Sequence, residues 1–247
     1  MKRSIFCTAI LALMGVSLFS CNPPKKGNGE IAARERAVSG FEKVEINGAY
    51  DVVLRKAATE RVVVETDENL HDYIELTVGG KKLTIKNLEP LISKQNIKIT
   101  VYYATLKGLS STGSSVISSD GMIKTDQLDI EFSGAGSMNL EVETEDLKVD
   151  MPGAGLIKLV GYANRQRLKM SGAGHLNALN LTTNETWIEL NGLGGADVHA
   201  LKKLDATLNG VGSIRYKGKP AELRSDVRGM GVIKPYAGKD DEQEGFI

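Results

Sequence analysis

Hydrophobic and polar residues alternate along most of the chain between residues 113 and 235, and pairs of glycines interrupt the alternation at regular intervals. Counted from the first glycine of each pair, the second and fourth residues before it and the fourth and sixth after it are mostly apolar. A period of two places these side chains on one face of an extended strand. The pattern therefore predicts a strand with one buried face on each side of every glycine pair.

The glycine pairs belong to a Gly-x-Gly phrase that is repeated at intervals of 18 to 21 residues. A repeat of this length cannot bury its apolar face alone, so it predicts units that stack on one another. Asp146 breaks the six-residue apolar period that a left-handed hexapeptide helix requires. We therefore predict an all-β fold, a right-handed single-stranded β-helix (a β-solenoid) with coils of about 19 residues. The structural corner glycines are Gly134, Gly136, Gly153, Gly155, Gly172, Gly174, Gly192, Gly194, Gly210, Gly212, Gly229 and Gly231.

Each coil is expected to contain a strand, a tight Gly-x-Gly corner, a second strand and a looser corner. Length variation places the looser corners at 143–146, 162–166, 182–186 and 218–222. In two adjacent tight corners, Asn191 and Asn209 are expected to form an amide ladder. The residue between the two glycines is expected to point inward, where the strands converge. These middle residues are Ala135, Ala154, Ala173, Leu193, Val211 and Met230.

The folded domain is predicted to span residues 41–236. It starts this early because Gly48 has apolar neighbours in the same phase as the later corners. Residues 41–108 are less regular, with a hairpin or corner expected at Gly79 and Gly80, and we expect them to cap the N-terminal end. Residues 109–236 are the regular coils, and 237–247 are an acidic tail. A run of charges keeps an open sheet edge from pairing with other molecules, and the alternative is a disordered tail without a role.

The first 20 residues have a basic start and an apolar run that is too short to span a bilayer stably. The run ends in Leu18-Phe19-Ser20-Cys21, which resembles a bacterial lipobox, so Cys21 is the predicted lipidation site. Residues 1–20 are then a lipoprotein signal peptide. Residues 21–40 contain two prolines and few apolar residues, which is typical of a flexible tether. The expected location is the outer membrane, on the cell surface or on the periplasmic face.

The formal net charge is zero, with 31 basic and 31 acidic residues, so there is no electrostatic case for nucleic acid as a partner. The histidines, His71, His175 and His199, share no metal-ligand spacing, and we expect each at the surface. No Walker loop, nucleophile elbow or His-Glu-x-x-His motif occurs. Each Gly-x-Gly phrase precedes a strand, whereas a dinucleotide site needs a helix there. We therefore expect no metal, no cofactor and no catalytic residues.

The outward positions of the predicted strands carry mostly charged residues. Glu131 and Asp150 are expected to meet across neighbouring coils, with Lys148 beside them. This favours charge pairing on a solvated face over the carboxylate cluster of a polysaccharide lyase. Trp187, the only tryptophan, is expected to point outward next to Arg167. The pair is a candidate ligand-binding site, because the ring can stack on a sugar or on a partner's side chain.

Three features occur together: the repeated Ser-Gly-Ala-Gly phrase, the upstream lipobox, and the opening Phe41-x-Lys43-Val44-x-Ile46-Asn47-Gly48-Ala49-Tyr50-Asp51-Val52. In this combination the chain resembles, over residues 41–231, the head GIN domain family ("putative auto-transporter adhesin") of Bacteroidetes-type lipoproteins. The resemblance implies a right-handed β-helix of pectin-lyase-like shape, no recognised catalytic residues and a role in adhesion.

These observations favour a non-enzymatic, lipid-anchored envelope protein, an adhesin or binding scaffold that presents a β-helix surface to a glycan or protein ligand. One alternative is a structural or envelope-stress scaffold that faces the periplasm. A less favoured alternative is a degenerate polysaccharide-active enzyme. The lipid anchor makes the membrane a partner, and an open solenoid end or a flat exposed face favours homo-oligomers.

Overall fold

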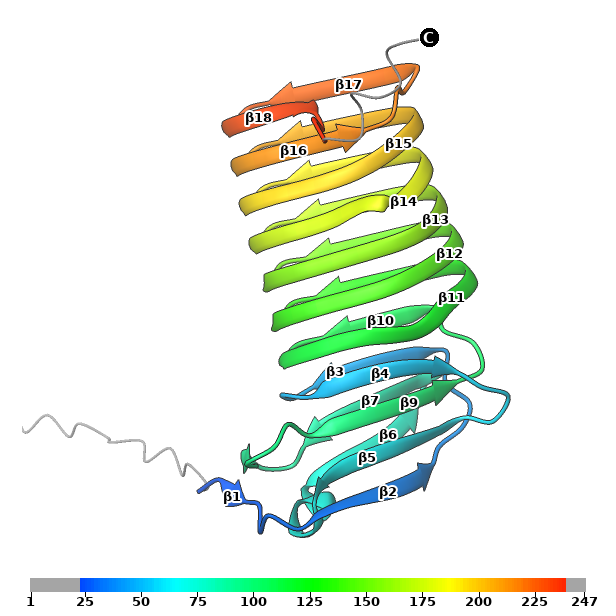
Figure 1. Ribbon diagram of the computed structural model, residues 1–247, viewed down its shortest axis with the longest axis vertical. Helices are drawn as coiled ribbons and strands as arrows, with labels where there is room; N and C mark the ends of the chain where they lie inside the picture. The colour runs from blue at the N-terminus through cyan, green and yellow to red at the C-terminus, as the bar shows by residue number, and fades with distance from the viewer. Residues whose placement is uncertain (1–22, 239–247) are drawn as a thin grey trace, which may run out of the picture.

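The computed structural model describes residues 23–238. The predicted signal peptide, Cys21 and residues 239–247 of the predicted acidic tail lie outside the described residues. The described chain is a β-solenoid of about seven turns (Figure 1), so the predicted all-β solenoid is confirmed. No helix within residues 23–238 combines the length and the hydrophobicity that are needed to cross a membrane.

Five long strands form the regular part of the solenoid. They pair in parallel, so that residues one repeat apart lie side by side, as Asp150 and Lys169 do. The predicted amide ladder is confirmed, because Nδ2 of Asn209 donates a hydrogen bond of 2.7 Å to Oδ1 of Asn191. The five strands are β11 (Ser114–Phe132), β12 (Ala135–Met151), β13 (Ala154–Met170), β14 (Ala173–Leu190) and β15 (Leu193–Leu208).

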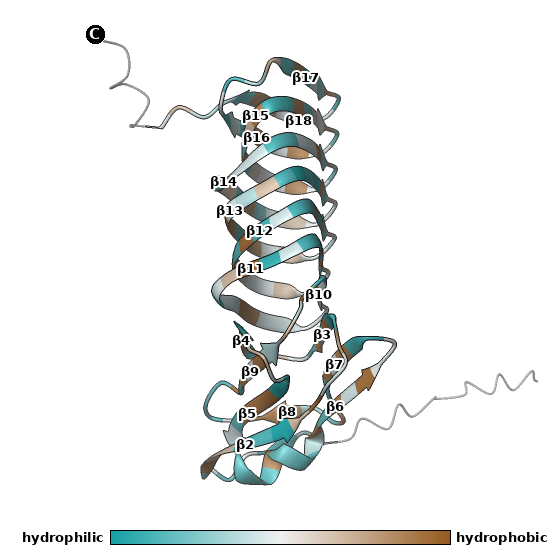
Figure 2. Cartoon of the chain, turned by 90° about the vertical axis from the view of Figure 1, so that its right-hand side faces the viewer, coloured by the Kyte–Doolittle hydropathy of each residue, from teal (hydrophilic) through white to brown (hydrophobic). Residues whose placement is uncertain are grey.

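The inward apolar side chains of successive coils pack on one another in files. Met151, Met170 and Leu190 are consecutive members of one file, and each is at most 3% exposed. Figure 2 shows hydrophobic and hydrophilic residues alternating along the coils. Each coil buries its apolar face because another coil lies against it, as the repeat length predicts.

The residues between the paired glycines point outward, and the inward orientation predicted for them is wrong. All six are exposed, with Met230 at 75%. The glycines lie directly on the backbone of the preceding coil, and a Cβ at Gly172 would stand 1.8 Å from the carbonyl oxygen of Gly153. Backbone contact therefore closes the corner, and the residue between the glycines is left facing solvent.

The looser corners differ from the expected loops, because the strands of β11–β15 continue through them. One inward position in this bend is occupied by small, buried side chains in successive coils, namely Thr144, Ala163, Thr183 and Ala200. Small side chains leave the backbone room to bend while its parallel pairing continues. In the last coil a loop at 218–221 separates β16 (Val211–Lys217) from β17 (Glu222–Val227), and β18 (Met230–Pro235) follows.

Before β11 the solenoid divides into two sheets, as expected for a less regular N-terminal part. On one face β11 is followed by β10, β3, β7 and β6, and on the other by β4, β9, β5 and β2. The hairpin predicted at Gly79 and Gly80 is confirmed as the turn between β6 and β7. The strands are β3 (Lys43–Asn47), β4 (Asp51–Lys56), β5 (Arg61–Asp67), β6 (Ile74–Gly79), β7 (Lys82–Asn87), β8 (Leu91–Ile92), β9 (Lys98–Tyr103) and β10 (Gly108–Ser111).

The segment predicted as a flexible tether at 21–40 is instead part of the fold over much of its described length. β1 (Lys25–Lys26) pairs with β8, and β2 (Ile31–Ala37) pairs antiparallel with β5 along its whole length. The 3₁₀-helix η1 (Glu68–Tyr73) lies beside β2 and β5 at this end (Figure 1). Most side chains of β2 are exposed, so its composition gives no burial signal. Backbone hydrogen bonds to β5 place it, and these are invisible in the sequence.

Candidate functional site

One outer face of the solenoid carries two adjacent columns of polar side chains. We call it the site face, and it is made by β7, β3, β10, the C-terminal halves of β11–β15, and β17. The strand register defines both columns. The first contains Lys82, Lys43, Gly108, Asp129, Lys148, Arg167, Trp187, Asp205 and Arg224. The second contains Thr84, Glu45, Ser110, Glu131, Asp150, Lys169, Glu189, Thr207 and Asp226.

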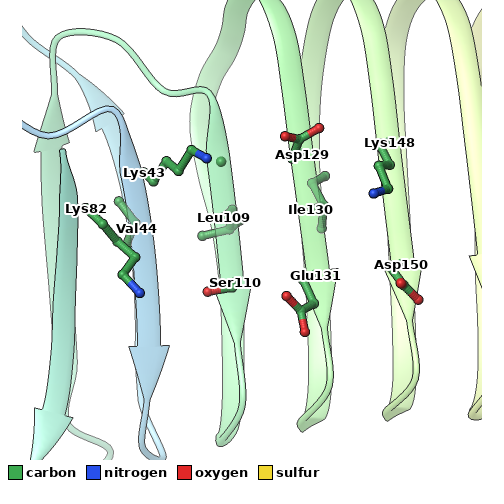
Figure 3. A pocket seen from close by; sticks show the side chains of 11 residues that line it. Lys43, Val44, Lys82, Leu109, Ser110, Asp129, Ile130, Glu131, Lys148 and Asp150 are labelled. Atoms are coloured by element: carbon green, nitrogen blue, oxygen red, sulfur yellow. The ribbon is translucent and has the colours of Figure 1, made fainter. Parts of the chain in front are cut away.

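A hollow of about 310 Å³ interrupts these columns at β10. It forms because Gly108 has no side chain and Ser110 has a short one, whereas the strands on either side carry long charged residues. The side chain of Lys43 reaches toward the place left open, and its Cγ is 3.0 Å from the position that a Cβ of Gly108 would take. Figure 3 shows two lysines on one side of the hollow, Lys43 on β3 and Lys82 on β7, and on the other side the carboxylates of β11 and β12 with Lys148 among them.

Most charged residues around the hollow have no ionic partner. Among the ion pairs within residues 23–238, none involves Lys43, Asp129, Glu131, Lys148 or Asp150. The exception among the lining residues is Lys82, which pairs with Glu45. The carboxylate of Asp129 accepts hydrogen bonds of 3.1 Å from Nε2 of Gln127, and the other charges can be satisfied by a ligand as well as by water.

Charge pairing also occurs in the next outward column, two residues before the first column, where Asp146 lies opposite Arg165. Arg165 donates two hydrogen bonds to the carboxylate of Asp146, of 2.7 Å and 2.6 Å. The hydrogen bonds from Arg165 hold the pKa of Asp146 below its ordinary value. The predicted charge pairing on a solvated face is therefore present at Asp146, but the residues predicted for it, Glu131 and Asp150, do not take part.

Sequence reasoning did not find the hollow. The signal was available, because Gly108 and Ser110 stand five and three positions before Gly113, in the phase of the two outward columns. The Gly113 corner is an eroded copy of the phrase. The repeat is therefore weakest at the coil that carries these two residues, and their short side chains do not stand out from the pattern.

Trp187 and Arg167 lie together, as predicted, on adjacent coils of the site face. The Cζ of Arg167 is 5.0 Å from the centre of the indole, and Nζ of Lys203 is 5.8 Å from it. The ring is half-buried by these cations. In the strand register Trp187 lies four strand-to-strand steps from Gly108, which is about 19 Å at the usual strand spacing. The hollow and the tryptophan thus lie along one line on the same face.

Glu131 and Asp150 are opposite each other on β11 and β12, so their predicted meeting across coils is confirmed. Lys148 is next to them on the same face and opposite Asp129. In the part of the chain that the structure describes, no three His, Cys, Asp or Glu residues are grouped to hold a metal ion.

The histidines are less exposed than expected. His71 is fully buried, and its Nε2 is 3.0 Å from the carbonyl oxygen of Ala32, so the predicted surface position is wrong. Burial lowers the pKa of His71, and it lowers the pKa of the half-buried His199 as well. The Nε2 of His175 is 2.9 Å from Oδ2 of Asp197. This burial has no signal in the sequence, because it arises from packing around η1 and between coils.

Comparison with known proteins is consistent with this architecture. A family model described as "Putative auto-transporter adhesin, head GIN domain" matches residues 40–220. No protein among curated sequences matches the chain.

Several crystal structures have the same fold. A "putative adhesin" from Bacteroides fragilis is 26% identical, with a TM-score of 0.82, and the match covers 85% of this chain and 99% of that chain. A "putative adhesin" from Parabacteroides merdae is 22% identical, with a TM-score of 0.68 and coverage of 86% and 98%. A "putative lipid binding protein" from Parabacteroides distasonis is 21% identical, with a TM-score of 0.68 and coverage of 87% and 100%.

Proposed function

Because this chain belongs to the family described as "Putative auto-transporter adhesin, head GIN domain", we propose that it is a non-enzymatic binding protein of the cell envelope. Its ligand is an extended glycan that lies along the site face. The observation that carries the proposal is the hollow over Gly108 and Ser110, whose charged border is largely free of ion pairs.

The chemistry of the border defines the ligand. Lys43 and Lys82 can donate hydrogen bonds to an acidic group, while the carboxylates of Asp129, Glu131 and Asp150 can accept hydrogen bonds from hydroxyl or amino groups. An oligosaccharide that carries acidic groups supplies both kinds of partner within one sugar or two. The border is cationic at β3 and β7 and mostly anionic at β11 and β12, where Lys148 is the one cation, so its two sides favour different groups of the glycan.

Trp187 provides the second contact. A glycan that extends from the hollow across β12 and β13 reaches the indole, where the apolar face of a sugar ring can stack. Arg167 and Lys203 lie over the ring in the unbound chain, so a sugar that stacks there displaces one of these cations, which can then bind its hydroxyl or acidic groups. An adhesin gains from two such contacts, because linked sites strengthen weak individual binding.

A glycan array that includes acidic oligosaccharides tests the proposal. The wild-type chain should bind a subset of them, and Ser110→Trp, which fills the hollow from an outward position, should abolish that binding. Trp187→Ala should weaken binding to the longer members of the subset. Lys158→Ala is the matched control, because Lys158 is exposed on the opposite face, and it should bind as the wild type does. Equal binding by wild type and Ser110→Trp contradicts the proposal.

We further propose that the protein is anchored to the outer membrane by lipid on Cys21, with the site face presented at the cell surface. The family description as an adhesin supports an envelope location. Cys21→Ser should release the protein from the membrane fraction. Protease treatment of intact cells should digest the wild-type protein. Digestion only after the envelope is opened would favour the scaffold that faces the periplasm.

A polysaccharide-active enzyme is the second candidate, because Glu131 and Asp150 stand opposite each other beside Lys148. A lyase of this kind releases unsaturated sugars from acidic polymers, and Asp150→Ala would abolish the release. We expect no such products from the wild-type chain, in agreement with a binding role.

A further inference from the structure

The C-terminal end of the solenoid is open among the described residues. Leu223 and Val227, on β17, are 46% and 45% exposed, whereas Leu204 and Leu208, their neighbours on β15, are fully buried. These residues occupy the inward positions of the last coil, and no further described coil covers them. The apolar interior of the solenoid therefore reaches the surface at this end, where β17 and β18 are the last strands (Figure 1).

The backbone of the last coil is also unpaired on one side. β17 pairs only with β15 and β18 only with β16, so the outer edge of each strand presents free N–H and C=O groups. Such edges readily pair with another strand. The N-terminal end also has unpaired strand edges, on β2 and β6, but there η1 lies against β2 and β5 and its Leu70 is buried, so the apolar interior is covered. The exposed apolar interior at the C-terminal end therefore has no matching exposed interior for head-to-tail stacking.

We propose that the C-terminal end is a homodimer interface, in which two copies stack end to end about a two-fold axis and β17 pairs antiparallel with β17 of the second copy. A closed two-fold dimer uses the same surface in both copies, so it needs only the one open end that this fold has. β18 of each copy meets its counterpart in the same way on the opposite face.

The charges along β17 determine the register. The outward residues of β17 are Glu222, Arg224 and Asp226, and Arg228 follows directly after the strand; in reverse order each of these positions carries the opposite charge. With Ser225 on the axis, Arg224 faces Asp226 of the second copy, and Glu222 faces Arg228 of the second copy. The same register places Leu223 against Val227 of the second copy on the inner side, which covers the exposed apolar residues. Antiparallel pairs of opposite charge stabilise a sheet, and like charges destabilise it.

The single chain leaves these charges available. Within residues 23–238 Arg224 forms no ion pair, and Glu222 and Arg228 keep 73% and 70% of their side chains exposed in the pairs that they do form. Asp226 and Arg228 pair with each other in the single chain, so the dimer exchanges this exposed pair for pairs across the axis and breaks no buried interaction.

Sedimentation equilibrium of the full chain, measured over a range of concentrations, tests the interface. The wild type should associate to a dimer. Arg224→Asp places two like-charged pairs across the axis and should weaken the dimer by at least about tenfold. The swapped double variant Arg224→Asp with Asp226→Arg recreates both pairs in the reverse order and should restore the dimer. Lys158→Asp, far from this end, is the matched control and should dimerise as the wild type does.

The restoration is the decisive result, because a variant that merely damages the fold is not repaired by a second charge reversal. A wild-type chain that stays monomeric at every concentration overturns the proposal. A double variant as weak as Arg224→Asp alone also overturns it, because the register then pairs other residues.

Discussion

Arg215 holds the carboxylate of Asp197 through two parallel hydrogen bonds, from Nε to Oδ1 and from Nη2 to Oδ2, each 2.6 Å long. His175 approaches the same carboxylate from the preceding coil. The Asp197 side chain is only 2% exposed, although its position in the repeat points outward. Hydrogen bonding to this carboxylate raises the pKa of Arg215. Three successive coils are thus joined on the face opposite the site face.

Arg215→Ala should lower the free energy of unfolding by about 3 kcal/mol, because it leaves a buried carboxylate without its main partner. Arg165→Ala is a matched control, since Arg165 makes the same two-bond contact with Asp146 where both side chains are at least one-third exposed. That change should lower the free energy by less than about 1 kcal/mol. Denaturant unfolding measures both, and equal losses would show that burial does not decide the strength of the contact.

Gly172→Ala should destabilise the solenoid by about 1–3 kcal/mol or more, because the added methyl group would overlap the backbone of Gly153 and push two coils apart. Gly79→Ala is the control, since nothing lies within 4 Å of the position that its Cβ would take. It should leave stability unchanged or raise it by less than about 1 kcal/mol. Thermal unfolding followed by circular dichroism compares the two. A harmless Gly172→Ala would contradict the backbone contact at the corner.

Arg36→Ala should cost about 2 kcal/mol of stability, because the guanidinium donates hydrogen bonds to the carbonyl oxygens of His71 and Ile74 at the end of η1. Arg34→Ala removes a neighbouring arginine that makes only long, exposed ion pairs with Glu68 and Asp72. That control should cost less than about 1 kcal/mol. If neither change lowers the free energy of unfolding, the packing of residues 31–37 against η1 is contradicted and these residues are better described as a tether.

Stability should fall as the pH is lowered from about 7 through the ordinary range of histidine, near 6.5, toward the lower pKa of His71 in the folded protein. Burial favours the neutral ring, so the unfolded chain binds a proton in this interval and the folded chain does not. His71→Gln should remove part of this dependence while keeping a donor for the carbonyl of Ala32. Unfolding free energies at several pH values give both slopes, and identical slopes would contradict the burial of a neutral ring.

Arg167→Ala should shift the fluorescence emission of Trp187 to longer wavelength, because it uncovers one side of the only indole. The stability change should be below about 1 kcal/mol, as for other exposed cation–π pairs. Lys169→Ala, on the same strand but in the second column, is the control and should leave the emission unchanged. An unshifted spectrum for Arg167→Ala would mean that the cation does not cover the ring in solution.

The sequence repeat alone was enough to predict most of the fold. The spacing of the glycine pairs and the inward apolar positions specified parallel stacking, so Met151, Met170 and Leu190 fell in one buried file as expected. The same phase identified the outward columns and therefore the neighbourhood of Arg167 and Trp187. Alternation is enough to assign inward and outward positions, because a strand has only two faces. A fixed repeat length then places equivalent positions of successive coils next to each other.

Tertiary structure alone decided what the period does not encode. Backbone hydrogen bonds to β5 hold β2 in place. The side chains of Asp197 and His71 are buried by neighbours from other elements. The middle residues of the corners turn outward because the glycine backbones of successive coils are in contact. The hollow at Gly108 exists because strands of different coils place long side chains around two short ones. Each of these features depends on contacts between segments that are far apart in the chain. The residues involved have no local sequence pattern that distinguishes them, so only the folded structure identifies them.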